Sequence, residues 1–288
     1  MSLSDPERVA LDAEYNLRAA VPEYLSYFAR YEAASRALRA RWRGRLNLAY
    51  GATPRQAIDL FLPDARDAPV LVFIHGGYWQ SRDRKDFSFV AAPWLERGVA
   101  VALIGYELAP AVRIDAIVEQ VRAGLAWLHR HARSHGCDPA RLFVAGHSAG
   151  GHLAAMALAT DWRRFGLPED LIKGVAAISG VFDLEPIRRC YLNEVVGLDP
   201  DEVLRNSPIH LPLHGRCAVT VAVGELETRA FHEQSRSYAA KLERAGWPCE
   251  LLVQAGVDHF GIVMSMEDGD APIVRALARQ MGLPAAPT

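Results

Sequence analysis

The sequence predicts an α/β fold with a mostly parallel central sheet and helices on both faces. From residue 69 onward, short apolar runs of strand length alternate with segments of helix length. The apolar runs are continuous, as in strands that are buried on both faces of a parallel sheet. We interpret residues 1–288 as a single domain, because folds of this class often keep one core at this length.

The chain before residue 69 predicts a helical segment followed by a hairpin. Residues 5–42 have apolar positions at helical spacing, and Pro22 opens a second segment, so we expect two helices. Residues 46–50 and 57–62 then predict two strands that are joined through a turn at Gly51.

The alternating region supplies the rest of the sheet and the helices that cover it. The expected strands are 69–74, 98–104, 141–145, 175–179, 218–223 and 250–253, and the expected helices are 114–132, 151–159, 231–244 and 272–281. Residues 182–213 interrupt the alternation, since they lack clear periodicity and contain four prolines. We expect this insertion and the helical segment of about residues 1–45 to cap a pocket at the carboxyl ends of the strands, where such sheets bind ligands.

The composition narrows the class of partner. Half of the residues are hydrophobic, 23% are charged and the formal net charge is -2, so we expect a small-molecule substrate and neither nucleic acid nor a membrane. The first residues lack a secretion signal, and the four cysteines are widely spaced, which favours reduced thiols in a cytoplasmic protein. No recognised ligand spacing occurs among the histidines and carboxylates, so neither a metal nor a cofactor is expected. A homodimer remains one alternative for the oligomeric state.

The pentapeptide Gly146-His147-Ser148-Ala149-Gly150 stands between an expected strand and an expected helix. This context predicts a nucleophile elbow, a tight turn that holds a serine hydroxyl above the sheet, with glycines that permit close backbone approach. We therefore predict that Ser148 is a nucleophile; the alternative is an ordinary glycine-rich turn.

A second glycine motif, His75-Gly76-Gly77-Tyr78-Trp79, directly follows the expected strand 69–74. Attack by a serine on a carbonyl needs backbone N–H groups that face the oxygen as it becomes negative. The candidates for this oxyanion hole are Gly76, Gly77, Tyr78 and Ala149, unless the motif is only a turn between a strand and a loop.

A serine nucleophile also needs a histidine base and an acid, which follow it in the order acid, then histidine in this architecture. His259 lies in a loop just after the strand 250–253, whereas His232 lies within a helical run and is expected to face solvent. Asp258 adjoins His259, and consecutive side chains diverge, which disfavours it as the acid. Three carboxylates remain open from the residues alone: Glu225, Glu227 and Asp183.

Taken together, these motifs resemble those of the kynurenine formamidases, or arylformamidases, which are α/β-hydrolases related to the hormone-sensitive-lipase-like esterases. The resemblance spans most of the chain and rests on residues 15–16, 50–51, 60–63, 75–79, 146–151, 179–184, 206–208, 223–224, 231 and 234–235. It implies an α/β-hydrolase fold. In the family pattern an acid stands four residues before the Phe of a Phe-x-x-Gln-Ser segment, which falls on Glu227. Many relatives have aspartate there, so Glu225 and Asp183 stay open.

The resemblance implies hydrolysis of N-formyl-L-kynurenine to L-kynurenine and formate through a formyl group on Ser148, with His259 as base. A carboxylesterase that acts on short-chain or aryl esters is the alternative, and a ligand-binding homologue without catalysis is a distant one. Tyr78, Trp79 and Phe260 adjoin the proposed catalytic residues. We expect them to form an aromatic wall for the leaving group; the alternative is that they belong to the core.

Several further residues lie near these motifs, and some of them have two interpretations. A substrate carboxylate would need a cation, for which Arg82, Arg84 and Lys85 are candidates, although basic runs in loops are usually solvated. The segment 106–110 is similar to one near the pocket of the esterase relatives, or it is a packed turn. His147 and His152 are expected to make local hydrogen bonds.

Overall fold

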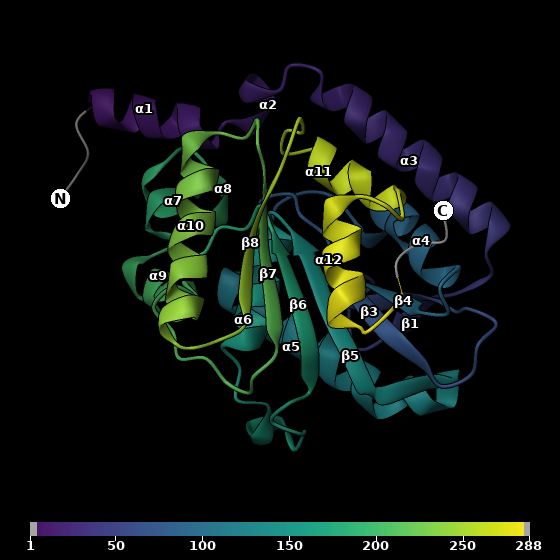
Figure 1. Cartoon of the computed structure of the whole chain (residues 1–288). Helices are drawn as coiled ribbons and strands as arrows, with labels where there is room; N and C mark the ends of the chain where they lie inside the picture. The colour runs from purple at the N-terminus through teal and green to yellow at the C-terminus, as the bar shows by residue number, and fades with distance from the viewer. Residues whose placement is uncertain (1–4, 285–288) are drawn as a thin grey trace.

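Eight strands form one central sheet in the order β1-β2-β4-β3-β5-β6-β7-β8 (Figure 1). The computed structural model describes residues 5–284, so the two ends of the predicted domain, 1–4 and 285–288, lie outside the described residues. The strands are β1 (Gly44–Ala49), β2 (Ala57–Phe61), β3 (Ala68–Ile74), β4 (Ala100–Ile104), β5 (Cys137–His147), β6 (Ile172–Ile178), β7 (Ala218–Gly224) and β8 (Cys249–Gln254). β2 pairs antiparallel with β1 and β4, and the other pairs are parallel, which confirms the predicted sheet.

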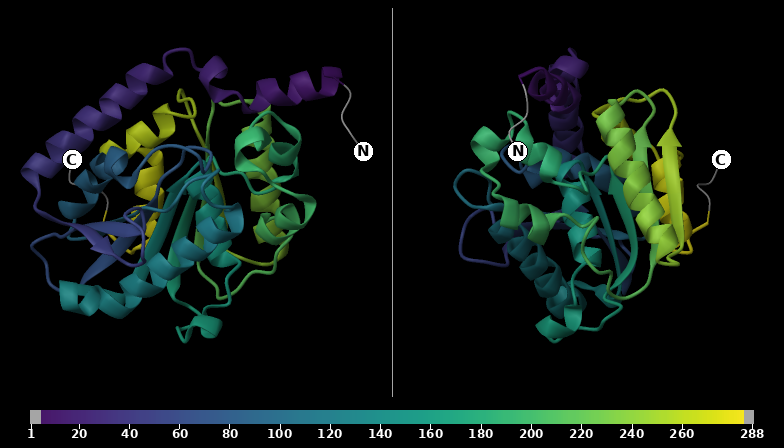
Figure 2. Two further views of the ribbon diagram at one scale, coloured as in Figure 1. Left: turned by 180° about the vertical axis from the view of Figure 1, so that it is seen from behind. Right: turned by 90° about the vertical axis from the view of Figure 1, so that its left-hand side faces the viewer.

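Helices cover both faces of the sheet. They are α1 (Asp5–Tyr15), α2 (Leu17–Ala20), α3 (Tyr24–Arg41), α4 (Ala92–Leu95), α5 (Ile114–His131), α6 (Ala149–Leu158), α7 (Glu185–Arg189), α8 (Asn193–Val196), α9 (Pro200–Asn206), α10 (Arg229–Arg244), α11 (Gly261–Met264) and α12 (Pro272–Gln280). α12 lies in front of the strands in Figure 1, whereas α5 and α6 lie behind them and come forward in the left view of Figure 2. Four short 3-10 turns complete the order: η1 (Arg84–Ala91), η2 (Ala132–His135), η3 (Trp162–Phe165) and η4 (Ser265–Glu267).

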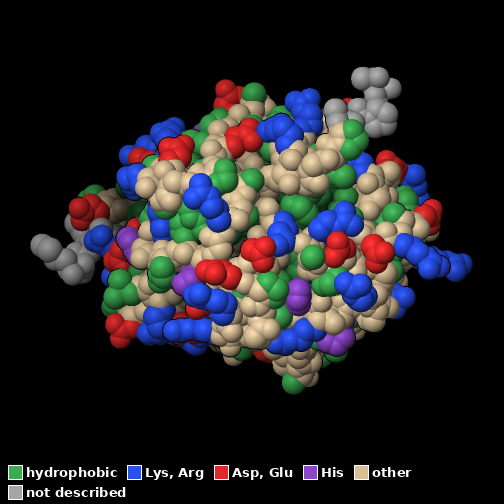
Figure 3. Space-filling view, turned by 60° about the horizontal axis from the view of Figure 1, so that its bottom comes forward, with side chains coloured by type: hydrophobic (Ala, Val, Ile, Leu, Met, Phe, Trp, Pro, Cys, Tyr) green, Lys and Arg blue, Asp and Glu red, His purple; other side chains and the backbone are tan. Residues whose placement is uncertain are grey.

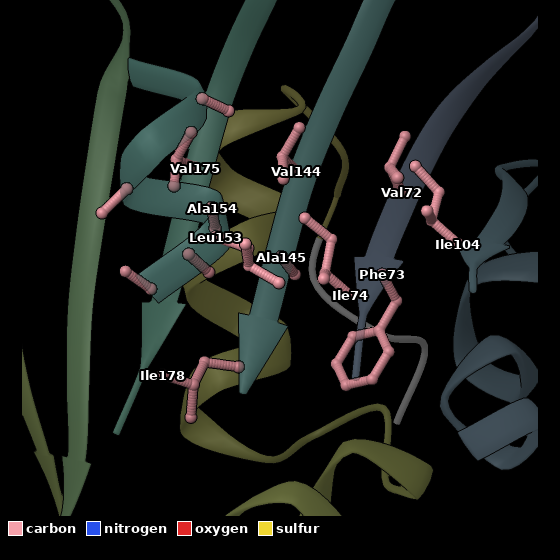
Figure 4. Packing of buried hydrophobic residues seen from close by; sticks show 14 of the residues in the cluster. Val72, Phe73, Ile74, Ile104, Val144, Ala145, Leu153, Ala154, Val175 and Ile178 are labelled. Atoms are coloured by element: carbon pink, nitrogen blue, oxygen red, sulfur yellow. The ribbon is translucent and has the colours of Figure 1, made fainter. Parts of the chain in front are cut away.

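The central strands are buried on both faces, as their continuous apolar runs predict. Figure 4 shows side chains of β3, β5 and β6, such as Val72, Val144 and Val175, packed together with Leu153 and Ala154 of α6. All five of these side chains are almost completely buried. The sheet therefore forms the rigid core whose strand ends support the loops described below.

Two expectations about the caps differ from the structure. Three helices precede β1, because the Asn16 side chain accepts a hydrogen bond from Ala19 N and begins the extra helix α2. The 182–213 insertion contains α7, α8 and α9, each of seven residues or fewer. Helices this short leave no clear helical period in the sequence, which explains why none was predicted.

The N-terminal helices α1 to α3 run across one end of the sheet, along the top of Figure 1. Tyr31 of α3 donates a hydrogen bond to the Phe260 carbonyl at 2.6 Å, and α3 packs along η1. Of the insertion, α9 packs against α5. The N-terminal helices are thus the larger part of the cover over the carboxyl ends of the strands.

The surface away from α1 to α3 carries basic and acidic side chains that are interspersed (Figure 3). Within residues 5–284, no helix combines the length and the apolar character that a membrane crossing requires. All four cysteines are unpaired, and three of them are buried.

Candidate active site

Ser148 occupies the turn between the end of β5 and the start of α6, with φ 58° and ψ −120°. A positive φ is unusual for a serine and is held here by the packed strand and helix. A Cβ on Gly146 would lie 2.0 Å from the Gly150 carbonyl oxygen, and one on Gly150 would lie 1.9 Å from the Ile74 oxygen. Only glycine fits at both positions. The Ser148 hydroxyl makes no capping bond to α6, which leaves it available to a ligand.

His259 and Glu227 form a buried pair beside the elbow. His259 follows β8, and its Nδ1 donates a hydrogen bond to Glu227 Oε2 at 2.7 Å. Because a carboxylate accepts, the proton lies on Nδ1 and Nε2 keeps a free lone pair. Among the described residues, Ser148 and His259 line the same cavity.

The other two candidate acids are engaged elsewhere. Glu225 accepts a hydrogen bond from Gly256 N at 2.8 Å, and Asp183 accepts one from Glu185 N at 2.9 Å. Of the three carboxylates that the sequence left open, Glu227 is therefore the one that contacts the His259 ring.

The second oxygen of Glu227 is also fixed. Its Oε1 accepts hydrogen bonds from Ser179 Oγ and from Gly224 N, the latter at 2.7 Å. Ser179 has φ 48° and follows β6 directly. The sequence analysis included Ser179 in a motif of the resemblance but gave it no role, although its place after a buried strand at the same sheet edge is a signal for one. The carboxylate is thus held from both oxygens.

The loop after β3 brings backbone amides toward the elbow. Gly77 has φ 117°, and its carbonyl accepts hydrogen bonds from Gln80 N and Ser81 N. The amides of Gly77 and Tyr78 have no acceptor within residues 5–284, and Ala149 N is the first amide of α6, where no intrahelical acceptor exists. These amides are free to donate to one oxygen, and the α6 dipole favours negative charge there.

Gly76 is needed for a different reason. A Cβ at this position would lie 2.9 Å from the Ser148 Cβ and 2.7 Å from the His147 carbonyl oxygen. The absence of a side chain therefore lets the loop approach the elbow closely.

The stacked rings of His75 and Tyr106 support the glycine loop. The rings of His75 and Tyr106 are 4.3 Å apart and nearly parallel, and the Tyr106 hydroxyl donates to the His75 carbonyl at 2.7 Å. Burial lowers the pKa of His75 to about 4, so the ring is neutral. Tyr106 is fully buried. At Tyr106, therefore, the segment 106–110 is a packed turn, which was one of its two interpretations.

His147 and His152 are also buried, and both make local hydrogen bonds. His147 Nε2 donates to the His259 carbonyl at 2.8 Å, and His152 Nε2 donates to the Asn206 carbonyl at 2.7 Å. Burial lowers the pKa of His147 well below its usual value and that of His152 to about 4. Both are therefore neutral at physiological pH.

The prediction that Trp79 belongs to the substrate wall is wrong. Its side chain is fully buried, lies edge-on to the His152 ring and donates from Nε1 to His152 Nδ1 at 3.2 Å. The positive φ of 56° at Trp79 accompanies this inward direction. Tyr78 and Phe260 do line the cavity. The reason for the error is that neighbouring residues in a tight loop point to opposite sides.

The cavity above Ser148 has a volume of about 440 Å³. Its floor contains the glycine loop, the elbow and His259, and its upper wall comes from α2 and α3. The cavity residues that sequence reasoning did not identify are Asn16, Leu17, Arg18, Phe28, Tyr31, Gln80, Ser81, Phe87, Tyr191 and Leu192. Most of them come from segments far from the elbow in sequence, and Asn16 alone belonged to a motif of the resemblance.

The three basic side chains that follow the glycine loop lie in different environments. Arg82 lines the cavity, with its guanidinium 3.4 Å from the centre of the Phe28 ring. Arg84 is buried against Asp59 at 3.1 Å, and Lys85 is exposed. Only Arg82 among the three lies where it can reach a ligand. Within residues 5–284, no three His, Cys, Asp or Glu side chains gather as a metal site requires.

Comparisons with known proteins agree with this geometry. The family model BD-FAE matches residues 58–193. Kynurenine formamidase of Salmo salar is 35% identical over 82% of each chain, and that of Danio rerio is 33% identical over 82% of each. An isoprenylcysteine alpha-carbonyl methylesterase of Arabidopsis thaliana is 26% identical over 76% of this chain and 57% of its own.

Solved structures show the same architecture. A candidate thioesterase from Silicibacter sp. tm1040 has a TM-score of 0.82 and 33% identity, over 93% of this chain and 98% of that one. A thermostable carboxylesterase from a metagenomic library has a TM-score of 0.71 and 22% identity, over 92% and 98% of the two chains. The second likeness shows the fold alone. Together with the sheet order, these findings establish an α/β-hydrolase fold.

Proposed function

The chain belongs to the kynurenine formamidase family of α/β-hydrolases, and from this premise we propose that it hydrolyses N-formyl-L-kynurenine to L-kynurenine and formate. It is a hydrolase, as its family is. The observation that carries the substrate proposal is the 35% identity to a kynurenine formamidase over 82% of each chain. The pairing of His259 with Glu227 beside Ser148 supports the hydrolytic mechanism.

In the proposed first step, Ser148 attacks the formyl carbon while His259 Nε2 accepts the hydroxyl proton. The amides of Gly77, Tyr78 and Ala149 donate to the oxygen of the tetrahedral intermediate. His259 then passes its proton to the arylamine nitrogen, the C–N bond breaks and kynurenine leaves. The product on the enzyme is a formyl ester of Ser148. Glu227 keeps the His259 proton on Nδ1 and stabilises the imidazolium that forms.

Water completes the reaction. His259 accepts a proton from the water, whose oxygen attacks the formyl ester, and the same amides stabilise the second intermediate. His259 returns the proton to Ser148 Oγ, the C–O bond breaks and formic acid leaves, which ionises to formate and a proton in water. No cofactor is needed for either half of the reaction.

Two physical features favour a formamide of an aromatic amine. An arylamine of low basicity leaves more readily than an alkylamine, and a formyl group needs little room beside Ser148. The cavity of about 440 Å³ lies within the roughly 300–1,000 Å³ of small-molecule sites. Its aromatic wall, which includes Phe28, Tyr31 and Phe260, suits the ring of the leaving group.

The four unpaired cysteines support a cytoplasmic location for the protein.

A carboxylesterase with the same residues is the second candidate function. The methylesterase relative and the candidate thioesterase structure favour it. A comparison of kcat/KM for N-formyl-L-kynurenine and for p-nitrophenyl acetate separates the two. Negligible formamide turnover beside rapid ester hydrolysis would exclude the formamidase proposal.

Replacement of the nucleophile tests the mechanism itself. We expect Ser148→Ala to lower kcat by about 10⁴-fold or more on either substrate, because a covalent intermediate can no longer form. Ser134→Ala, at an exposed serine outside the cavity wall, is the control and should leave kcat unchanged. Full turnover by the Ser148 variant would contradict the mechanism and also the reading of the chain as a serine hydrolase.

A further inference from the structure

The cavity wall is electrostatically one-sided. Among the residues described, its charged side chains are Arg18 and Arg82, and no aspartate or glutamate lines it. The chain as a whole has a formal charge of -2, so this local excess of positive charge is not a property of the general composition. A site with this charge favours anionic ligands.

Arg82 is available to a ligand. Its side chain is 26% exposed, and its nearest carboxylate, Asp86, is 3.9 Å away, which is beyond hydrogen-bond distance. Within residues 5–284 its guanidinium donates no hydrogen bond; it stacks on the Phe28 ring instead. Stacking fixes the plane of the guanidinium and leaves its edge free for a carboxylate, which matches the fork of N–H donors.

The neighbouring Arg82 backbone is also held in place. Arg55 donates to the Arg82 carbonyl, and Arg82 has φ 74°. Partial burial lowers the Arg82 pKa, Asp86 opposes this effect, and the charge of Arg18 lowers the pKa further. Two like charges at one cavity wall repel each other, and an anion bound at that wall relieves the repulsion.

Two carboxylates close to the cavity, Glu227 and Asp258, already accept hydrogen bonds from protein groups. Glu227 binds His259, and Asp258 accepts hydrogen bonds from the Tyr27 hydroxyl and from the amides of Phe260 and Gly261. Neither lines the cavity, so an ammonium group inside it would meet no carboxylate.

We propose that Arg82, assisted by Arg18, forms a carboxylate subsite that binds the amino-acid carboxylate of the leaving group, and that the cavity has no matching site for the ammonium group. This inference rests on the proposed function for its choice of ligand. It makes the carboxylate a determinant of specificity and the amino group dispensable.

Inhibition measures the subsite without formamide turnover. Three inhibitors of p-nitrophenyl acetate hydrolysis are compared: L-kynurenine, its carboxamide, and the analogue that lacks the α-amino group. We expect the carboxamide to bind at least about tenfold more weakly than L-kynurenine, because it loses the Arg82 contact and keeps a positive charge. The des-amino acid should bind as tightly as L-kynurenine or more tightly. Equal inhibition by all three, or weaker binding of the des-amino acid than of the carboxamide, would overturn the proposal.

Substitution assigns the effect to the residue. Arg82→Gln should lower the ratio of kcat/KM for N-formyl-L-kynurenine to that for p-nitrophenyl acetate by about ten- to a hundredfold, mainly through KM, and weaken inhibition by L-kynurenine equally. Arg82→Lys should recover part of the loss. Arg30→Gln removes a charge from an exposed arginine over Tyr27, outside the cavity wall, and should not change the ratio.

The outcomes separate the two proposals. An unchanged ratio in Arg82→Gln, or an equal loss on both substrates with unchanged inhibition, would show that Arg82 is structural. If the wild type does not hydrolyse N-formyl-L-kynurenine but L-kynurenine still inhibits through Arg82, the proposed function fails while the subsite stands.

Discussion

The floor and the roof of the cavity are built in different ways. The floor comprises Gly76, Gly77, Ser148 and His259, which lie at the ends of buried strands or in the loops that follow them, and Glu227 holds His259 from outside the cavity. The roof comprises Asn16, Leu17, Arg18, Phe28 and Tyr31, which come from α2 and α3. The floor is fixed by local turns on a rigid sheet, whereas the roof depends on contacts between distant parts of the chain. The chemistry is therefore assigned to the floor, and the choice of substrate to the roof together with Arg82, which stacks on Phe28 of α3.

The contacts that hold the floor differ in kind from those that hold the roof. In the floor, each oxygen of Glu227 is bound, and glycines make the turns that no other residue fits. The roof is held by polar contacts to several distant parts of the chain; for example, Tyr78 donates to the Tyr15 carbonyl at 2.9 Å, and Tyr31 donates to the Phe260 carbonyl. A change in the floor should thus affect kcat, and a change in the roof should affect KM.

The largest effect among the remaining tests is expected for Glu227→Gln. The amide can donate to Nδ1 and so favours the wrong tautomer of His259, for which we expect kcat to fall by about 10⁴-fold while the fold is kept. The measurement is kcat at pH 7.5 together with circular dichroism. Glu225→Gln is the matched control, because the Glu225 carboxylate binds Gly256 N and the residue is exposed. A larger loss in the control than in Glu227→Gln would reassign the acid.

The same contrast explains what the sequence could predict. Ser148 and the glycines of both motifs were predicted from strand, turn and helix order, which is local information. For the acid, the resemblance indicated Glu227, but the residues alone left Glu225 and Asp183 open, because only the folded loop shows which carboxylate faces His259. Trp79 was misplaced because backbone dihedral angles in a tight loop decide which neighbour points inward.

The roof lay largely beyond sequence reasoning. A helical cap was expected, but which residues of α2 and α3 face the cavity depends on how those helices cross the sheet. Arg18 has no neighbouring motif that would mark it as a cavity residue. Long-range packing of this kind has no local pattern in one sequence.

Acid should destabilise the fold through histidines that are buried next to the floor. His75 and His152 have pKa values of about 4 in the folded protein against 6.5 for an ordinary histidine, because burial disfavours their charged forms. These histidines therefore bind protons below about pH 6.5 in the unfolded chain, but only below about pH 4 in the folded chain. Stability is fully present above about pH 7 and falls as the pH drops through this window, by about 3 kcal/mol for each histidine. Residues 5–41 contain no histidine.

Urea unfolding between pH 7.5 and pH 4.5 measures this loss, and His152→Gln isolates one contribution. Glutamine can still donate to the Asn206 carbonyl and accept from Trp79 Nε1, but it does not titrate. We expect the variant to lose less stability over this range than the wild type. Parallel curves for the two proteins would mean that His152 is not a source of the acid sensitivity.

The smallest expected effect tests the attachment of the roof. Glu14 of α1 accepts a hydrogen bond from Ala230 N at 2.9 Å, in the first turn of α10. Glu14→Ala removes this cap and the charge that favours the helix N-terminus, at a cost of about 1 kcal/mol in the free energy of unfolding. Because α1 leads directly into the cavity residues of α2, we also expect a several-fold rise in KM at unchanged kcat. Asp64→Ala, at an exposed carboxylate in the loop after β2, is the control and should change neither quantity. A fall in kcat at constant KM would show that the roof also fixes the catalytic residues, which would remove the distinction between the two regions.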